Sequence, residues 1–125
     1  MGDAPPAAGR FTDAEAVARA HAIFDPIAAH YLELPDVDMG RMFASEGLRI
    51  RGKIFSLISF NGDLMLKLPA ARTVELVDAG EAERVEMRGR AMREWVFVSV
   101  KRSDLWDPLV GEAFAYLDEI TPSPA

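Results

Sequence analysis

The 125-residue chain contains no cysteine. Disulfides, thiolate zinc sites and a cysteine nucleophile are therefore excluded. No apolar run approaches the roughly 18 residues that a membrane-spanning helix needs. The N-terminal stretch MGDAPPAAGR also lacks the apolar core of a secretory signal. The sequence therefore predicts a soluble, cytoplasmic protein that does not use a membrane.

Histidine is nearly as scarce, because the chain has only His21 and His30. At about 100° per residue, two positions nine apart point to opposite sides of a helix, so the two imidazoles cannot share a metal ion. No H-E-x-x-H pattern or comparable histidine–carboxylate arrangement occurs elsewhere. We therefore expect no metal site and no cofactor.

Motifs of catalysis are missing as well. The carboxylates Asp36/Asp38 and Glu81/Glu83/Glu86 lie in polar segments, where solvated acids are common. None of the serines lies in a G-x-S-x-G turn. The run Gly47–Lys53 has the spacing of a phosphate-binding loop, but it alternates like a strand and is followed by Ile54 instead of Ser or Thr. The chain is predicted not to be an enzyme.

Charge is present but unevenly distributed, with 14 basic and 20 acidic residues giving a net charge of −6. Residues 1–40 carry 2 basic and 7 acidic side chains (−5), and residues 103–125 carry 5 acidic ones (−5). Residues 41–102 carry 12 basic and 8 acidic side chains (+4). Either acidic helices pack against a mildly basic sheet, or the middle segment offers a basic surface to an anionic partner.

The length fits one domain, which we place at residues 12–120 between disordered tails at 1–11 and 121–125. Thr12 and Glu15 form a capping box that predicts a helix up to Pro35. Pro26 either kinks this helix or breaks it, with Asp25 capping a second segment. The apolar pattern then changes to that of strands between Val37 and Leu68.

The strongest strand signal is Lys53–Phe60, followed by Asn61-Gly62, the preferred pair for a two-residue hairpin turn. That turn predicts that Ile58 faces Met65 across the hairpin. One face, the predicted core, then carries Phe55, Leu57, Leu64, Leu66 and Leu68. The other face carries Ile54, Ser56, Ile58, Phe60, Met65 and Lys67.

Further along, Pro69 and Gly80 predict a helix over Ala70–Ala79. Glu83–Met87 and Glu94–Val100 read as strands, and Ser103 is expected to cap a last helix. The predicted fold class is therefore α+β, a two-layer domain with an antiparallel sheet of about five strands and helices on one face. The predicted order is helix, three or four strands, helix, two strands, helix.

Several short runs carry a family resemblance. They are Arg41-Met42-Phe43-Ala44, Gly47-Leu48, Gly52-Lys53-Ile54-Phe55, Leu66-Lys67-Leu68-Pro69 and Gly89-Arg90-Ala91-Met92-Arg93-Glu94-Trp95-Val96. Across residues 12–120 the chain resembles the TfoX N-terminal domain-like family, except that Ala44 stands where the family commonly has glycine.

The resemblance implies a two-layer α+β domain without established catalytic residues, related to regulators of natural competence. It implies structural roles for its motif positions, with Gly47 and Gly52 in turns and Arg93–Glu94 as a charge pair. The positions implied to be structural are Met42, Phe43, Gly47, Gly52, Phe55, Met92, Glu94 and Trp95.

Because helices of so short a chain cover only one sheet face, the other is expected to expose an apolar patch. We predict a non-enzymatic regulatory or interaction domain that binds a second copy or a protein partner there. The predicted interaction residues are Ile58, Phe60, Met65, Lys67, Trp95 and Phe97.

Two alternatives remain open. A nucleic-acid-binding regulator would use basic side chains with aromatic stacking, although the sequence pI of about 4.9 disfavours it. Its candidate contacts are Arg49, Arg51, Lys53, Arg88, Arg90 and Arg93, which could equally be solvated rim residues. The second alternative is a small-molecule-binding or enzymatic domain.

Overall fold

Six strands form one antiparallel sheet in a computed structural model that describes residues 13–42 and 45–123. The helices are α1 (Ala14–Leu32), α2 (Ala70–Asp78) and α3 (Trp106–Ile120), with a short 3₁₀ helix, η1 (Val100–Leu105). The strands are β1 (Val37–Met42), β2 (Ser45–Ile50), β3 (Lys53–Ile58), β4 (Leu64–Lys67), β5 (Glu83–Met87) and β6 (Arg90–Val98). Their spatial order is β1-β2-β3-β4-β6-β5. The predicted α+β class is confirmed, with six strands in place of about five.

Helix α1 is continuous through Pro26, so neither a break nor a second cap at Asp25 occurs. Asp13 is the N-cap and accepts a hydrogen bond from the Ala16 amide at 3.0 Å, whereas the predicted cap Thr12 lies outside the described residues. Proline leaves the carbonyl four residues before it, on Ala22, without its helical partner. Both residues are exposed, so water can satisfy that carbonyl.

The hairpin between β3 and β4 forms where predicted, but with a three-residue loop. The Ser59 amide donates to the Asp63 carbonyl at 2.8 Å, and the Gly62 amide donates to the Ser59 carbonyl at 3.0 Å. Gly62 takes φ +91°, the left-handed conformation that such a loop requires. Ile58 therefore pairs with Leu64 and not with Met65, one position away from the predicted register.

A bulge in β3 changes which side chains face the helices. Leu48 of β2 pairs with Ser56 while its neighbour Arg49 pairs with Ile54, leaving Phe55 as the extra residue. An extra residue resets the strict alternation of a strand. Phe55, Ser56 and Ile58 consequently lie on the helix side, whereas Ile54 and Leu57 lie on the opposite side.

The last helix begins later than predicted. Ser99, not Ser103, acts as a cap, with its hydroxyl accepting from the Lys101 amide at the start of η1. Helix α3 then begins at Trp106, whose indole N–H donates to the Ser99 carbonyl at 3.2 Å. This hydrogen bond satisfies the one polar group of a side chain that is fully buried.

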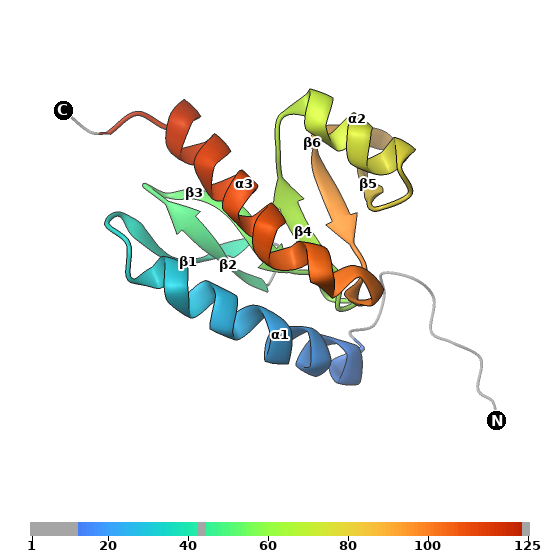
Figure 1. Ribbon diagram of the computed structural model, residues 1–125, viewed down its shortest axis with the longest axis horizontal. Helices are drawn as coiled ribbons and strands as arrows, with labels where there is room; N and C mark the ends of the chain where they lie inside the picture. The colour runs from blue at the N-terminus through green and yellow to red at the C-terminus, as the bar shows by residue number, and fades with distance from the viewer. Residues whose placement is uncertain (1–12, 43–44, 124–125) are drawn as a thin grey trace.

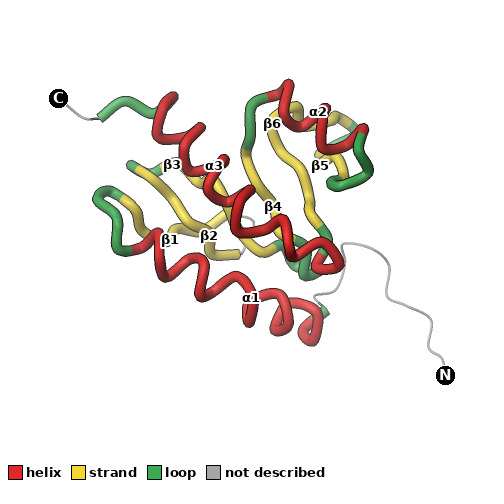
Figure 2. The backbone as a smooth tube through the Cα atoms, in the orientation of Figure 1, coloured by secondary structure: helices red, strands yellow, loops and turns green. Residues whose placement is uncertain are grey.

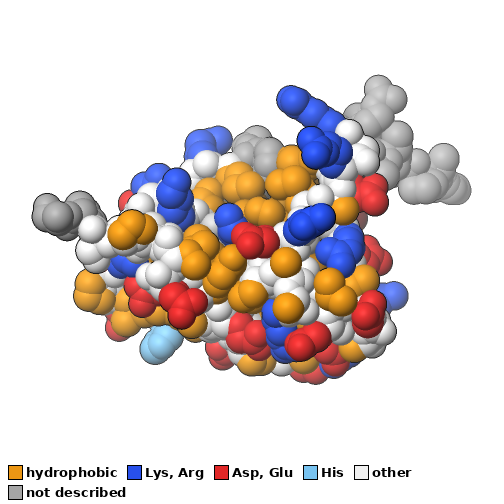
Figure 3. Space-filling view, turned by 90° about the horizontal axis from the view of Figure 1, so that it is seen from above, with side chains coloured by type: hydrophobic (Ala, Val, Ile, Leu, Met, Phe, Trp, Pro, Cys, Tyr) orange, Lys and Arg blue, Asp and Glu red, His pale blue; other side chains and the backbone are white. Residues whose placement is uncertain are grey.

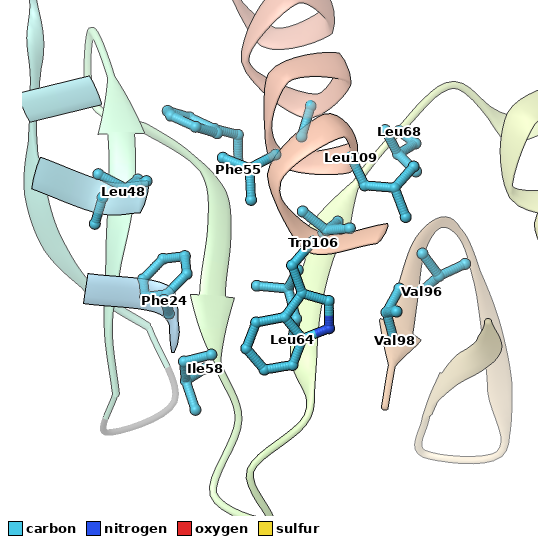
Figure 4. Close-up of a cluster of buried hydrophobic side chains, with 14 of the residues drawn as sticks. Phe24, Leu48, Phe55, Ile58, Leu64, Leu68, Val96, Val98, Trp106 and Leu109 are labelled. Atoms are coloured by element: carbon cyan, nitrogen blue, oxygen red, sulfur yellow. The ribbon is translucent and has the colours of Figure 1, made fainter. Parts of the chain in front are cut away.

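The main core lies between the helices and the sheet. Figures 1 and 2 show α1 and α3 lying across the sheet, and buried residues of all three α-helices join the same hydrophobic cluster. Trp106 is among the largest fully buried side chains in it, close to Leu64 and Ile58 (Figure 4). The helices therefore occupy one face of the sheet and leave the other to the strands.

Candidate functional site

The sheet face opposite the helices carries a second hydrophobic cluster, which we call the open face. Its buried members are Leu57, Met65, Val85 and Trp95, and its partly buried members are Met42, Ile54, Met92 and Phe97. Every one of these residues belongs to a strand, and none of the described helices contributes to the cluster. Its central side chains are already shielded, since Leu57 is 1% and Trp95 7% exposed. The apolar surface available for binding is therefore its partly buried margin.

Four of the six predicted interaction residues share this open face, namely Met65, Lys67, Trp95 and Phe97. Ile58 does not, because the β3 bulge turns it into the core beneath the helices. Phe60 lies in the β3–β4 loop beside the start of α1, where its carbonyl accepts from the Asp13 amide at 3.3 Å. Its side chain is 41% exposed, so it is an isolated surface aromatic away from the open face.

Arg51 holds the end of α3 in place. Its guanidinium donates to the Thr121 carbonyl through Nε at 3.0 Å and Nη2 at 2.6 Å, and to the Asp118 carboxylate at 2.8 Å. The side chain is only 12% exposed, and its backbone has φ +47° in the β2–β3 turn. Thr121, at the start of the expected C-terminal tail, is accordingly buried. Arg51 is thus committed to an internal contact.

Arg49 does lie on the open face but is neutralised there. Its Nε and Nη2 atoms donate to the two carboxylate oxygens of Asp38 at 2.8 and 2.7 Å. This hydrogen-bonded guanidinium lowers the pKa of the Asp38 carboxyl. The side chain crosses Gly40, where any Cβ atom would collide with it. Arg49, Arg51 and Lys53 therefore do not form the common basic face that the sequence suggested.

The remaining predicted cations, Arg88, Arg90 and Arg93, belong to the β5–β6 hairpin. Arg88 occupies the turn with φ +53°, and all three residues are exposed. None of them forms an ion pair with another described residue.

A cavity of about 440 Å³ opens at the end of the sheet where β3 and β4 separate. The last pair between these two strands on that side is Ser56–Leu66. The lining residues are Arg41, Met42, Gly52, Lys53, Ile54, Lys67, Trp95, Leu117, Ile120 and Thr121. We call it the sheet-end pocket. Figure 3 looks onto the side of the molecule where α2 and the end of α3 lie, and shows hydrophobic side chains gathered among Lys and Arg.

Three cations line the sheet-end pocket. Arg41 and Lys53 have no ion-pair partner among the described residues, and Lys67 Nζ lies 3.7 Å from Glu94 Oε1. The other Glu94 oxygen, Oε2, accepts a hydrogen bond from the Tyr116 hydroxyl at 2.6 Å. This contact raises the pKa of Tyr116 to about 12. The pocket therefore combines apolar walls with an excess of positive charge.

Sequence reasoning missed that Arg41 lines the same pocket as Lys67, and that Tyr116 binds Glu94, the acid nearest to Lys67 among the described residues. Arg41 lies near the end of β1, three positions from β4 in the strand order of the sheet, and Tyr116 lies on α3. No periodicity within either segment links them, because only the separation of β3 from β4 and the placement of α3 bring them together.

Acidic groups line a smaller cavity of about 220 Å³ that includes Asp63, Glu81, Glu83 and Arg102. Burial and the nearby Glu83 charge raise the pKa of the Asp63 carboxyl. Within residues 13–42 and 45–123, no group of three or more His, Asp and Glu side chains is arranged to hold a metal ion. No described helix is long and apolar enough to cross a membrane.

The motif positions have structural explanations. Gly47 lies within β2 and not in a turn, and a Cβ atom there would approach the Leu57 Cβ to 2.8 Å. Gly52 does occupy a turn, with φ +84°. Phe55 belongs to the main core, and Met42, Met92 and Trp95 belong to the open face. Glu94 pairs with Lys67 instead of Arg93; Phe43 lies outside the described residues.

Comparison with protein-family models finds no match for this chain, and comparison with curated proteins finds no match either.

Proposed function

We propose that the chain is a non-enzymatic regulatory domain of the TfoX N-terminal type that binds a protein partner, first of all a second copy of itself, through the open face. The observation that carries the proposal is that the helices of the described residues pack on one side of the sheet, while described residues of the strands form an apolar cluster on the other. An apolar surface without a covering helix is typical of association sites.

The margin of the open face suits a second copy of the same chain. Phe97 and Met92 are partly buried members of this margin, and both signs of charge lie among the facing residues, as in Glu83 opposite Phe97 and Lys67 opposite Trp95. In a two-fold dimer the same patch meets itself, so such a mixed surface can pair each cation with the carboxylate of the other copy.

The family resemblance supports this proposal through the placement of its motif residues. Met42 comes from one run of the resemblance and Met92 and Trp95 from another, yet all three belong to the open face.

Sedimentation equilibrium of the full chain tests the proposal. We expect a concentration-dependent dimer that Phe97→Glu converts to a monomer, because burying an unpaired carboxylate in an apolar contact is strongly unfavourable. Phe60→Glu is the matched control, since it adds the same charge to an exposed aromatic outside the open face. Circular dichroism of both variants shows whether they fold.

A monomer at every concentration would exclude self-association. If the Phe97→Glu variant dimerises as strongly as the wild type, the dimer interface does not include the open face. In the first case, cross-linking through a photoreactive residue at position 92 in cells tests for a different protein. Capture lost in the Phe97→Glu variant and kept in Phe60→Glu would place that partner on the open face, and no capture would refute the proposal.

A nucleic-acid interface is the second candidate, favoured by the three exposed arginines of the β5–β6 hairpin. Arg49 and Arg51 are already bound to carboxylates, and Lys53 lies apart in the sheet-end pocket, so this candidate relies on Arg88, Arg90 and Arg93. Fluorescence anisotropy with labelled DNA and RNA should show binding that weakens steeply with salt and is lost when these arginines are replaced by serine. Absence of binding at low salt excludes it.

A further inference from the structure

We propose that the sheet-end pocket is a binding site for a small organic anion, one that joins a carboxylate or phosphate head to an apolar body. The volume of about 440 Å³ lies within the range of small-molecule sites, which is roughly 300–1,000 Å³. Such sites are lined mainly by apolar side chains with a few polar groups that fix the ligand's orientation. The composition of this pocket follows that pattern.

Apolar side chains from two parts of the fold would contact the apolar body of the ligand. Met42, Ile54 and Trp95 come from the open face, and Leu117 and Ile120 come from the last turns of α3. Ile120 is 45% exposed and is one of the few large apolar side chains in that state. An apolar body placed here would cover it and contact the Trp95 side chain, which contributes favourable burial.

The positive charge of the pocket lining favours a ligand with an anionic head. Arg41, Lys53 and Lys67 line the pocket, and the acid nearest to any of them is Glu94, 3.7 Å from Lys67 Nζ. No described side chain accepts a hydrogen bond from Lys67 Nζ, although an ammonium group has three donors to place. The Tyr116 hydroxyl donates a hydrogen bond to the other oxygen of Glu94, which favours the observed position of this carboxylate.

The two arginines nearest to the pocket in the sequence, Arg49 and Arg51, are not free to bind a ligand anion. Arg51 is bound to the end of α3, and Arg49 is bound to Asp38. Arg49 and Arg51 therefore have carboxylate partners at hydrogen-bond distance. The cations lining the pocket have none at that distance.

The chain itself offers a sharp test, because it contains only three lysines, Lys53, Lys67 and Lys101. Two line the pocket, and the third, Lys101, is exposed in η1 outside it. Reductive methylation with an isotope label keeps the positive charge and gives each lysine its own NMR signal, in addition to one from the N-terminal amine. On titration with anilinonaphthalene sulfonate, an aromatic anion, we expect saturable shifts of the Lys53 and Lys67 signals and none at Lys101.

Affinity measurements complete the test. Replacing both pocket lysines, Lys53→Met with Lys67→Met, should weaken binding of this probe about 3- to 30-fold, since each partly exposed ion pair contributes modestly. Lys101→Met is the control and should leave affinity unchanged. The uncharged relative N-phenylnaphthylamine should bind wild type and double variant alike. Wild-type affinity for the anion should fall as salt rises from about 0.1 to about 1 M.

Competition then identifies the head group. Displacement of the probe by a medium-chain fatty acid, or by the alkyl phosphate of the same chain length, supports the proposal, and displacement by neither contradicts it. Shifts of all three lysine signals, or equal affinity of the double variant, would also overturn it. If the double variant does not fold, the NMR titration of the wild-type chain decides alone. Met42, Ile54 and Trp95 belong to both the pocket and the open face, but Phe97 does not line the pocket. Loss of dimerisation in Phe97→Glu and loss of probe binding in the lysine variant are therefore distinguishable results.

Discussion

Removal of the Arg51 side chain should loosen the end of α3 from the sheet. The guanidinium makes two hydrogen bonds to the Thr121 carbonyl and two to Asp118, one to its carbonyl at 3.0 Å and one to its carboxylate at 2.8 Å. Hydrogen bonds to a charged group contribute about 1.5–3 kcal/mol, and an abandoned buried acceptor adds a comparable penalty. Because Asp118 is half-exposed and water can replace part of its contact, we expect Arg51→Ala to cost about 3 kcal/mol.

Urea denaturation followed by circular dichroism measures this cost. At about 4 °C per kcal/mol, the corresponding fall in Tm is about 12 °C. Arg51→Gly provides an internal check on the backbone, since Arg51 has φ +47° and a side chain in that conformation costs roughly 1 kcal/mol. The glycine variant should therefore be about 1 kcal/mol more stable than the alanine variant.

Arg49→Ala is the matched control, two residues away and also paired with a carboxylate. Its pair with Asp38 is more exposed, and surface pairs contribute about 0–1 kcal/mol. If Arg51→Ala destabilises the protein no more than Arg49→Ala does, the proposed role of Arg51 is wrong.

Three further outcomes are expected. The Ser56 hydroxyl is fully buried with no hydrogen-bond partner among the described residues. Ser56→Ala should therefore raise the free energy of unfolding, measured by urea denaturation, by about 1 kcal/mol. A lower free energy of unfolding in this variant would show that the hydroxyl has a partner. Burial and the Glu83 charge raise the pKa of the Asp63 carboxyl in the folded protein. The protonated carboxyl therefore contributes to the stability of the fold below the pKa of the unfolded state, and this contribution is lost as pH rises through the folded pKa. Asp63→Asn should therefore match wild type at acidic pH and become the more stable protein as pH rises, and a constant difference across a pH series of melting curves would argue against this. In the Tyr31→Phe variant, tyrosinate absorbance should report Tyr116 ionising at about pH 12, and ionisation near pH 10 would mean that its hydrogen bond to Glu94 is absent.

Local chemistry in the sequence determined the order of elements. The proline at position 69 and the glycine at position 80 bracket α2, which ends at Asp78, close to the predicted Ala79. The apolar stripe of α1 places Ala20, Phe24 and Ala28 in the core, and the turn at Asn61-Gly62 joins two antiparallel strands. These features depend on contacts within a few residues, so their signals are complete in a short segment.

Only the tertiary structure decided which residues share a surface. Phe55 is accommodated as a bulge between β2 and β3, and this single extra residue sends Ile58 to the core and Leu57 to the open face. Likewise, Arg51 and Lys53 are two residues apart, yet one holds α3 and the other lines the sheet-end pocket. Alternation and charge along a strand cannot predict such outcomes, because register shifts and long side chains are settled by packing between distant segments.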